Sequence, residues 1–378
     1  MKNIYYWCPF IGKIATVKAV INSASSLAKY SNKKFAPTII NSCGEWDDFN
    51  YSLLERNIKT KKLRNFFKIN TNTSGYFKSR ITYIKVFVSC FFLLKNTLKK
   101  DQPEYLIAHL ITSLPIFLYL IFKFKTKLIV RVSGKVKMNF LRKFLWKMSK
   151  RNISLITCPT KETQKYFINL NLIEESKIVY LPDPIIEIDL ILQKKKISVE
   201  NLTYKDFFIM VGRFTKQKNH LLTIRCFKRI AEKKKNINLL IIGNGELKNE
   251  YKKEINRLRL NDRIQLVNYQ NNIFSYFKKS LGLISSSLWE DPGFVMIEAA
   301  ACNTFVISSD CSSGPKEFIG NDSGILFKNN NMQSLEQKIL EFLSLNESEI
   351  TQKKISAKKK AINFTKLRHF KILEHSLS

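Results

Sequence analysis

The stretch SSSLWEDPGFVMIEAAAC, residues 285–302, decides the fold of the C-terminal half of this chain. A strand-like apolar run leads into it, a polar loop carries Glu290, and Pro292-Gly293 opens a helical segment of small apolar residues. Glu298 is the one charge in FVMIEAAAC and lies about a turn and a half inside the helix. A charge on such an apolar helix must be paired or must contact something polar.

The start of this helix predicts a ligand that carries phosphate and hydroxyl groups. Free backbone N–H groups and the positive end of the helix dipole bind phosphate. Glu290 and Glu298 suit vicinal hydroxyls, one set on a ribose and one on a sugar. The alternative is that both are carboxylates favoured by the helix dipole, which fits Glu290 better than Glu298.

Three neighbouring loops have the same position between a strand and a helix. VGRFTKQKNH (211–220) delivers Arg213 and Lys218 to one strand end and predicts a pyrophosphate site, with an ordinary basic loop as the alternative. In IIGNGELKNE (241–250), Gly243 and Gly245 let a ligand approach the backbone, although a tight turn explains them equally well. SSDCSSGPKEFI (308–319) predicts a second anion-binding helix start or a capped turn.

Alternating apolar runs and amphipathic segments predict an α/β protein with parallel sheets. In the first half we expect strands at 1–8, 35–41, 104–109, 127–133 and 154–159, and helices at 15–30, 76–100, 112–124 and 136–150. In the second half we expect strands at 207–212, 238–243, 264–269, 281–286 and 304–308, and a helix at 219–234 capped by Asn219. The predicted divisions are a Rossmann-like domain at 1–183, a linker at 184–205, a second Rossmann-like domain at 206–360, and a C-terminal helix at 361–378 that packs on the first domain.

Composition and charge narrow the class of protein. Hydrophobic residues make up 45% of the 378 residues, which favours a folded chain, and the net charge of +34 favours anionic partners. Seven scattered cysteines without CxxC spacing argue against disulfides and zinc sites, and the N-terminus is not typical of a signal peptide, so we expect a cytoplasmic protein. Residues 105–122 are long enough for a membrane span, but a buried strand and helix fit them better.

The order of the motifs resembles family 4 of the retaining glycosyltransferases, which have the GT-B fold with a donor cleft between two Rossmann-like domains. GRFTKQKN, IIGNGE, EDPGFVMIEAAACNTFVISSDCSSGPKEFI and SGILF carry the resemblance over residues 205–330. Glu290 and Glu298 match the family's two glutamates separated by seven residues. PFIGKIATVKAVINSA, IAHLITSLP, RVSG and LPDPI extend it more weakly through the first half.

The resemblance implies that a nucleotide-diphosphate sugar is the donor. Arg213 and Lys218 would hold its diphosphate, and Glu298 would bind the ribose hydroxyls. Gly243 and Gly245 are assigned to the same donor site.

The catalytic assignments concern the transferred sugar. Glu290, with Gly293 and Phe294, would contact this sugar, and His109 resembles the family's sugar-facing histidine, with a core histidine as the alternative. Gly12 matches the acceptor-side loop, but Ile11-Gly12-Lys13 stands where two glycines are common, and EDPGF stands where EGFG-like sequences are more frequent.

The expected activity is therefore retaining, metal-independent transfer of a hexose to a glycan or lipid-linked acceptor in polysaccharide or lipopolysaccharide assembly. The departing diphosphate would steer the acceptor, so neither an enzyme nucleophile nor a cofactor is expected. Alternatives are a sugar-nucleotide epimerase, a phosphorylase and a basic nucleic-acid-binding protein. The last lacks a known module, so we expect no nucleic acid partner.

A basic amphipathic segment, KVKMNFLRKFLWKMSKR (135–151), predicts a membrane contact. Leu141, Phe144, Leu145 and Met148 form one helical stripe, with lysines mostly elsewhere around the helix. Together with residues 77–100 it suits peripheral attachment to the anionic inner face of the cell membrane. The alternative is that the stripe packs on the sheet of the first domain.

Overall fold

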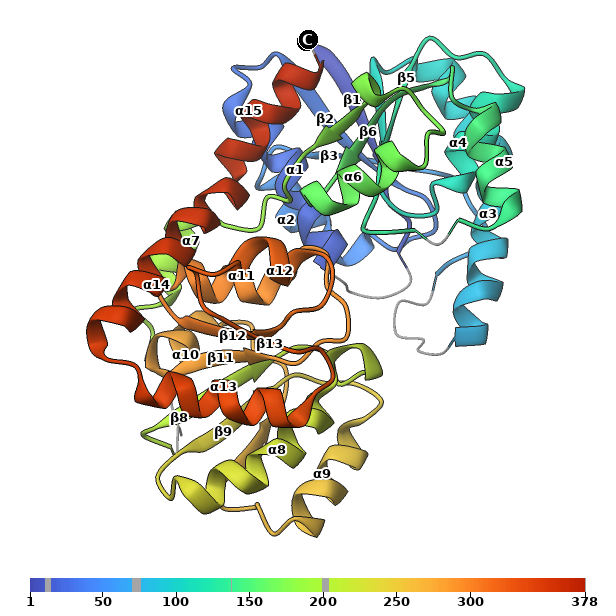
Figure 1. The fold of residues 1–378 in the computed structure, drawn as a ribbon. Helices are drawn as coiled ribbons and strands as arrows, with labels where there is room; N and C mark the ends of the chain where they lie inside the picture. The colour runs from blue at the N-terminus through green and yellow to red at the C-terminus, as the bar shows by residue number, and fades with distance from the viewer. Residues whose placement is uncertain (11–14, 70–75, 137, 199–203, 378) are drawn as a thin grey trace. The chain divides into compact units, whose positions relative to one another are not determined.

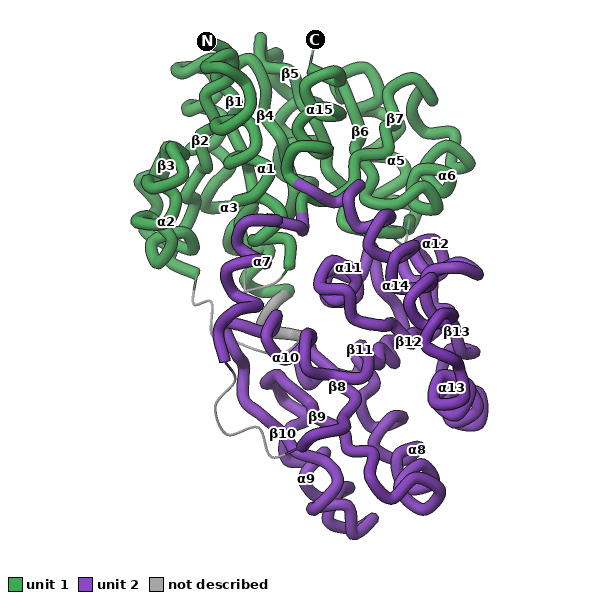
Figure 2. Tube along the Cα trace, turned by 90° about the vertical axis from the view of Figure 1, so that its left-hand side faces the viewer, with its two compact units in different colours: residues 1–184, 366–378 green, residues 185–365 purple. Residues whose placement is uncertain are grey.

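The computed structural model describes residues 1–10, 15–69, 76–136, 138–198 and 204–377, which form two compact units. Unit 1 comprises Met1–Pro184 and Lys366–Ser378, and unit 2 comprises Ile185–Thr365 (Figure 2). Each unit is built on one parallel β-sheet covered by helices, so each has a Rossmann-like α/β architecture. Gly12 lies outside the described residues.

The sheet of unit 1 has the strand order β3-β2-β1-β4-β5-β6-β7 (Figure 2). The strands are β1 (Lys2–Trp7), β2 (Phe35–Asn41), β3 (Lys59–Lys62), β4 (Tyr105–Ala108), β5 (Lys127–Arg131), β6 (Ile153–Cys158) and β7 (Ile178–Tyr180). The helices are α1 (Ala15–Tyr30), α2 (Asn50–Leu54), α3 (Tyr76–Asp101), α4 (Ser113–Ile121), α5 (Phe140–Met148), α6 (Lys161–Asn169) and α15 (Lys366–Leu377).

Both faces of this sheet are buried, which explains its continuously apolar strands. Tyr5 and Trp7 of β1 belong to a core shared with α3, α4, α5 and α6, whereas Ile4 and Tyr6 belong to a core shared with α1 and α15. Successive side chains of a strand point to opposite faces, so a strand covered on both sides needs apolar residues throughout.

The sheet of unit 2 has the order β10-β9-β8-β11-β12-β13. Its strands are β8 (Phe207–Val211), β9 (Asn238–Ile242), β10 (Ile264–Val267), β11 (Gly282–Ser285), β12 (Phe305–Ser309) and β13 (Ile325–Phe327). Its helices are α7 (Ile188–Lys194), α8 (His220–Lys233), α9 (Lys248–Arg257), α10 (Phe274–Lys279), α11 (Phe294–Ala301), α12 (Gly314–Ile319), α13 (Met332–Ser344) and α14 (Glu347–Ala361).

The boundaries of the units differ in detail from the predicted divisions. Residues 184–205, expected as a linker, contain α7, and Ile191 of α7 is buried in the core of unit 2. The chain passes from unit 2 into unit 1 at Lys366, and α15 packs against α1. There Tyr105 donates its hydroxyl hydrogen to the carbonyl of Leu377 at 2.6 Å, and His369 Nε2 lies 2.8 Å from Ser23 Oγ.

The expected strand and helix at residues 105–122 are confirmed as the buried strand β4 and the helix α4. Two other local expectations were wrong. The helix expected at 136–150 is confined to α5, where the Asn139 side chain caps the N-terminus by accepting from the Arg142 N–H at 2.9 Å. Asn219 precedes α8 with φ 49° and makes no capping hydrogen bond; instead its amide donates to Asn330 at 3.1 Å.

One described helix, α3, is long and apolar enough to cross a membrane. Its segment Arg80–Asp101 has a mean hydropathy of 1.4. Length and composition alone are weak grounds for a span. Val86, Cys90, Leu94 and Leu98 of this helix pack into the core of unit 1, so one side of α3 belongs to the folded domain.

Candidate functional site

The candidate site of unit 2 lies where the direction of the sheet connections reverses. β8 is bordered by β9 on one side and by β11 on the other, so the loops that follow β8 and β11 leave the sheet side by side. Ligands of open α/β sheets bind at such switch points, outside the carboxyl ends of the strands. A hollow of about 370 Å³, open to solvent, lies there and is lined by Lys218, Glu290 and Gly293 among others.

Lys218 and Glu290 form an ion pair in this hollow. The Lys218 ammonium donates to Glu290 Oε1, and Ser287 Oγ donates to the same oxygen at 2.7 Å. The side chains of Lys218 and Glu290 are 18% and 12% exposed. Two predicted site residues from separate loops therefore meet in one mostly buried polar cluster.

Three serines that the sequence analysis did not single out fix the geometry of this cluster. Ser286 Oγ donates to the carbonyl of Asn219 at 2.9 Å and ties the β11 loop to the β8 loop. Ser309 Oγ donates to the carbonyl of Ser287 at 2.6 Å. The run SSS at 285–287 was the available signal, because small hydroxyl side chains can satisfy loop carbonyls where strands end.

The EDPG loop is joined to the loop that follows β12. The N–H of Ser313 donates to the carbonyl of Glu290 at 2.8 Å. A Cβ on Gly314 would lie 1.9 Å from the carbonyl oxygen of Pro292, so only glycine permits this packing. Gly293, at the start of α11, has φ 94°, a conformation that favours glycine. The two predicted helix starts, α11 and α12, are thus held by one another's loops.

Gly243 and Gly245 have a packing role that differs from the predicted one. A Cβ on Gly243 would lie 1.8 Å from the carbonyl oxygen of Gly212, and one on Gly245 would lie 2.5 Å from that of Phe214. Because these two glycines lack a Cβ, the backbone of the loop that follows β8 can pack closely against them. The Phe214 N–H also donates to the carbonyl of Asn244 at 2.8 Å, which locks the two loops together.

The remaining predicted donor residues do not line the hollow. Arg213 is exposed and makes no ion pair within the described part of the chain. Glu298 is 6% exposed inside α11 and is not without a partner there. Phe294 is partly buried against the core of unit 2.

His220, which was not predicted, lines the hollow and is fully buried. Burial, and then the charge of Lys218, lowers the pKa of His220 to about 3, so its imidazole is neutral at physiological pH. Its ring packs edge-on against Phe214 and Tyr251. A neutral imidazole beside the ammonium avoids repulsion between two like charges.

His109 lies in unit 1, at the carboxyl end of β4, and is 7% exposed. Burial, and then the positive charge of Arg131, lowers its pKa well below the ordinary histidine value. It borders a hollow of about 240 Å³ that Arg131 and His369 also line. Arg131 in turn donates to Asp183 at 2.6 Å, so this buried region contains a paired charge.

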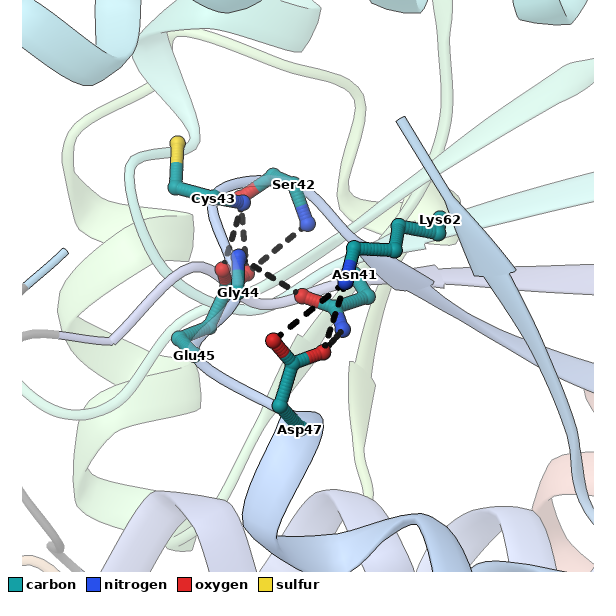
Figure 3. A network of polar contacts seen from close by, with 7 residues as sticks. All are labelled: Asn41, Ser42, Cys43, Gly44, Glu45, Asp47 and Lys62. Carbon is teal, nitrogen blue, oxygen red and sulfur yellow. Dashed lines mark hydrogen bonds and ion pairs between the residues drawn. The ribbon is translucent and has the colours of Figure 1, made fainter. Parts of the chain in front are cut away.

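The loop that follows β2 holds a second polar network in unit 1, which the sequence analysis missed (Figure 3). Glu45 accepts from the Ser42 hydroxyl and the Cys43 N–H, both at 2.7 Å, and burial raises its pKa. Asn41 accepts from the Gly44 N–H at 2.9 Å and donates to Asp47 at 2.7 Å. The polar run NSCGEWDD, directly after an apolar strand, could have indicated this network. Its side chains hold the loop in one conformation.

Part of the second half of the chain is similar in sequence to known proteins. Residues 193–361 match the family model described as glycosyl transferases group 1. An uncharacterized glycosyltransferase of Methanocaldococcus jannaschii is 43% identical over 118 residues, which cover 31% of this chain and 29% of that protein. A Campylobacter jejuni enzyme named N-acetylgalactosamine-N,N'-diacetylbacillosaminyl-diphospho-undecaprenol 4-alpha-N-acetylgalactosaminyltransferase is 36% identical over 142 residues, 37% of this chain and 38% of the enzyme. The matched segments thus span less than two fifths of these two relatives.

Solved structures resemble the chain over its whole length. A glycosyltransferase from Rickettsia africae has a TM-score of 0.77 with 19% identity and covers 99% of this chain and 97% of its own. Anabaena HepE, solved in complex with UDP and glucose, has a TM-score of 0.76 with 14% identity and covers 100% of this chain and 99% of its own. At these identities the likeness establishes the fold, which is the GT-B fold of glycosyltransferases.

Proposed function

We propose that this chain is a retaining glycosyltransferase that moves a hexose from a nucleotide-diphosphate sugar to a glycan or lipid-linked acceptor. The observation that carries the proposal is the Lys218–Glu290 pair in the hollow at the switch point of unit 2. The family match over residues 193–361 supports the same reaction class. Assembly of a cell-surface polysaccharide or lipopolysaccharide is the proposed context, in keeping with the names of two relatives, the Campylobacter jejuni enzyme and an amylovoran biosynthesis glycosyltransferase of Erwinia amylovora.

In the proposed donor complex, positive charge meets the diphosphate and carboxylates meet hydroxyls. Lys218 and the exposed Arg213 stabilise the negative charge that develops on the leaving diphosphate. The start of α11, with Gly293 and Phe294, adds backbone N–H groups. Glu298 holds the ribose hydroxyls, and Glu290 receives a hydroxyl of the transferred sugar. The proposed reaction needs no metal ion and no cofactor.

His109 is proposed as a second catalytic residue. Its neutral imidazole can accept or donate one hydrogen bond to a sugar hydroxyl without adding charge. His109→Ala is then expected to lower turnover while the nucleotide-induced thermal shift stays unchanged. A parallel loss of thermal stability and turnover would instead assign His109 to the core of unit 1.

The first experiment measures thermal unfolding with UDP-, GDP-, ADP- and dTDP-sugars, each with and without EDTA. The expected result is a rise in the unfolding temperature with sugars of one nucleotide, unaffected by EDTA and lost in Glu298→Ala. No rise with any donor, from a folded protein, would contradict the proposed donor site. With the active donor, NMR of the product's anomeric proton then tests retention, and an inverted product would contradict that part.

A further inference from the structure

Helices α3, α4 and α5 lie next to one another on one side of unit 1, with α4 in contact with both of the others (Figure 1). Ten of the 22 exposed large apolar side chains in the described part of the chain lie on these three helices. Exposed apolar side chains gathered on neighbouring helices of a folded domain point to an interaction site. The outer apolar face consists of Ile81, Ile84, Val88 and Phe92 of α3, Ile121 of α4, and Phe140, Leu141, Phe144 and Met148 of α5.

α3 has two apolar stripes on opposite sides. Cys90 belongs to the inner stripe and is fully buried, whereas Val88 belongs to the outer stripe and is 68% exposed. Side chains two residues apart on an α-helix, such as Val88 and Cys90, point in directions about 200° apart. A helix that is apolar all round is normally buried all round. Here the described residues cover the inner stripe and leave the outer stripe exposed.

α5 repeats this arrangement in a shorter helix. Trp146 is 4% exposed and packs against Phe167, with ring centroids 5.4 Å apart. Phe140 is 82% exposed, and Leu141 and Phe144 are exposed beside it. Leu141, Phe144 and Met148 of the predicted stripe therefore do not pack on the sheet, which was the alternative to a membrane contact. Leu145, the fourth residue of the stripe, is half-buried and packs against the core of unit 1.

Charge identifies the kind of partner that fits the outer apolar face. Between residues 76 and 151 the sequence has seventeen Lys and Arg but only two acids, Asp101 and Glu104. Lys143 and Lys147 are exposed and lie one turn from Phe140 and Phe144, respectively. The Lys95 ammonium lies 4.5 Å from the ring centroid of Phe122, at the edge of the patch. Apolar side chains ringed by lysines match an interface of acyl chains and anionic head groups.

We propose that the outer apolar face of unit 1 docks on an anionic lipid bilayer, with α3 and α5 lying in the interface. α3 does not span the bilayer in this arrangement, because its inner stripe is part of the core of unit 1. Phe140, Leu141 and Phe144 enter the acyl boundary, while Lys143 and Lys147 stay among the head groups. This docking is separate from the donor site, which is built from residues of unit 2.

The test is co-sedimentation of the full chain with phosphatidylglycerol/phosphatidylcholine vesicles and with phosphatidylcholine vesicles, each at low and high salt. We expect binding to the anionic vesicles that weakens with salt. The double variant Lys143→Ala/Lys147→Ala should bind about 30-fold more weakly, because each lysine near such a surface is worth about a factor of five. The matched control Lys252→Ala/Lys253→Ala, on exposed lysines of α9, should change binding little.

A second pair of variants tests the apolar part. Phe140→Ser/Phe144→Ser should lose vesicle binding, whereas Tyr51→Ser/Leu54→Ser, which removes equally exposed side chains from the α2 region, should retain it. Equal binding by both pairs, equal binding to neutral vesicles, or no binding by the wild type would overturn the proposal. So would concentration-dependent self-association without vesicles that Phe140→Ser/Phe144→Ser abolishes, since a second copy would then cover the face. Nucleotide-sugar thermal shifts of all variants report separately on the donor site.

Discussion

The Lys218–Glu290 pair permits a test that separates binding of the diphosphate from stability of the loop. In Lys218→Ala, Glu290 keeps its bond from Ser287 but loses the cation. Because both side chains are mostly buried, the cost resembles that of a charge-assisted hydrogen bond, about 1.5–3 kcal/mol. For a unit of this size we expect the unfolding temperature to fall by about 3–12 °C.

The same substitution removes a proposed contact to the leaving group. If Lys218 stabilises the transition-state charge by the same amount, turnover falls about 10- to 150-fold. Glu290→Gln keeps an acceptor for Ser287 and removes the negative charge. The double variant Lys218→Ala/Glu290→Gln should therefore regain most of the lost stability but none of the lost diphosphate binding.

The assay combines calorimetric unfolding of the wild type, both single variants and the double variant with the thermal shift that each nucleoside diphosphate produces. Non-additivity of the unfolding free energies measures the coupling between the two side chains. The reasoning is refuted if Lys218→Ala keeps both its unfolding temperature and its nucleotide-induced shift. It is also refuted if the double variant regains the full shift, because Lys218 would then serve only to neutralise Glu290.

Three further predictions concern stability. Arg131→Met should lower the free energy of unfolding by about 3–5 kcal/mol, because Asp183 stays buried without its cation; urea denaturation measures this. Gly243→Ala should disrupt the packing of the loops that follow β8 and β9, because the new Cβ overlaps the backbone. Nucleotide binding should be lost as a result. The Arg257 guanidinium holds the pKa of Glu254 at about 2, below an unfolded value of about 4.3, so its contribution is present above pH 4.3 and is lost as the pH falls towards 2.

Each of these predictions has a matched control. Asp183→Asn keeps a polar partner for Arg131 and should cost less than Arg131→Met. In Gly212→Ala the atoms nearest to the new Cβ belong to the flexible stem of Lys218, the closest at 3.3 Å, so this variant should alter nucleotide binding without unfolding the loop. In Glu254→Gln, the free energy of unfolding should fall less steeply as the pH is lowered below about 4.3. An unchanged pH dependence in this variant would show that other carboxylates dominate the loss of stability in acid.

The alternation of apolar runs was enough to predict most of the strands, because buried parallel strands are apolar on both faces. β3 was missed for a physical reason. It consists of Lys59–Lys62, KTKK, and forms the edge of the sheet, where pairing with β2 requires no apolar side chains. β7 and β13, each three residues long, were too short for the periodicity to show.

Lys218 and Glu290 were both expected in loops at the carboxyl ends of strands, where ligands of such sheets bind, but their ion pair was not predicted. The role of Gly243 did not follow, because a glycine needed for contact with a ligand and one needed for contact with another loop look alike in sequence. The orientation of α5 was also undetermined. Leu141 and Phe144 have the spacing of a core stripe, and the single large ring of Trp146 on the other side of the helix makes the core contact instead.

The two loop carboxylates, Glu45 and Glu290, show why only one of them serves as a ligand contact in the proposed function. Both lie after the end of a parallel strand, and both are mostly buried. Each oxygen of Glu45 already accepts a hydrogen bond from its own loop, through Ser42 on Oε1 and Cys43 on Oε2. At Glu290, Lys218 and Ser287 both donate to Oε1, so within the described residues Oε2 keeps its acceptor capacity. A sugar hydroxyl can therefore bind to Glu290 without displacing an existing bond, whereas at Glu45 it would have to break one, at a cost of about 1–3 kcal/mol.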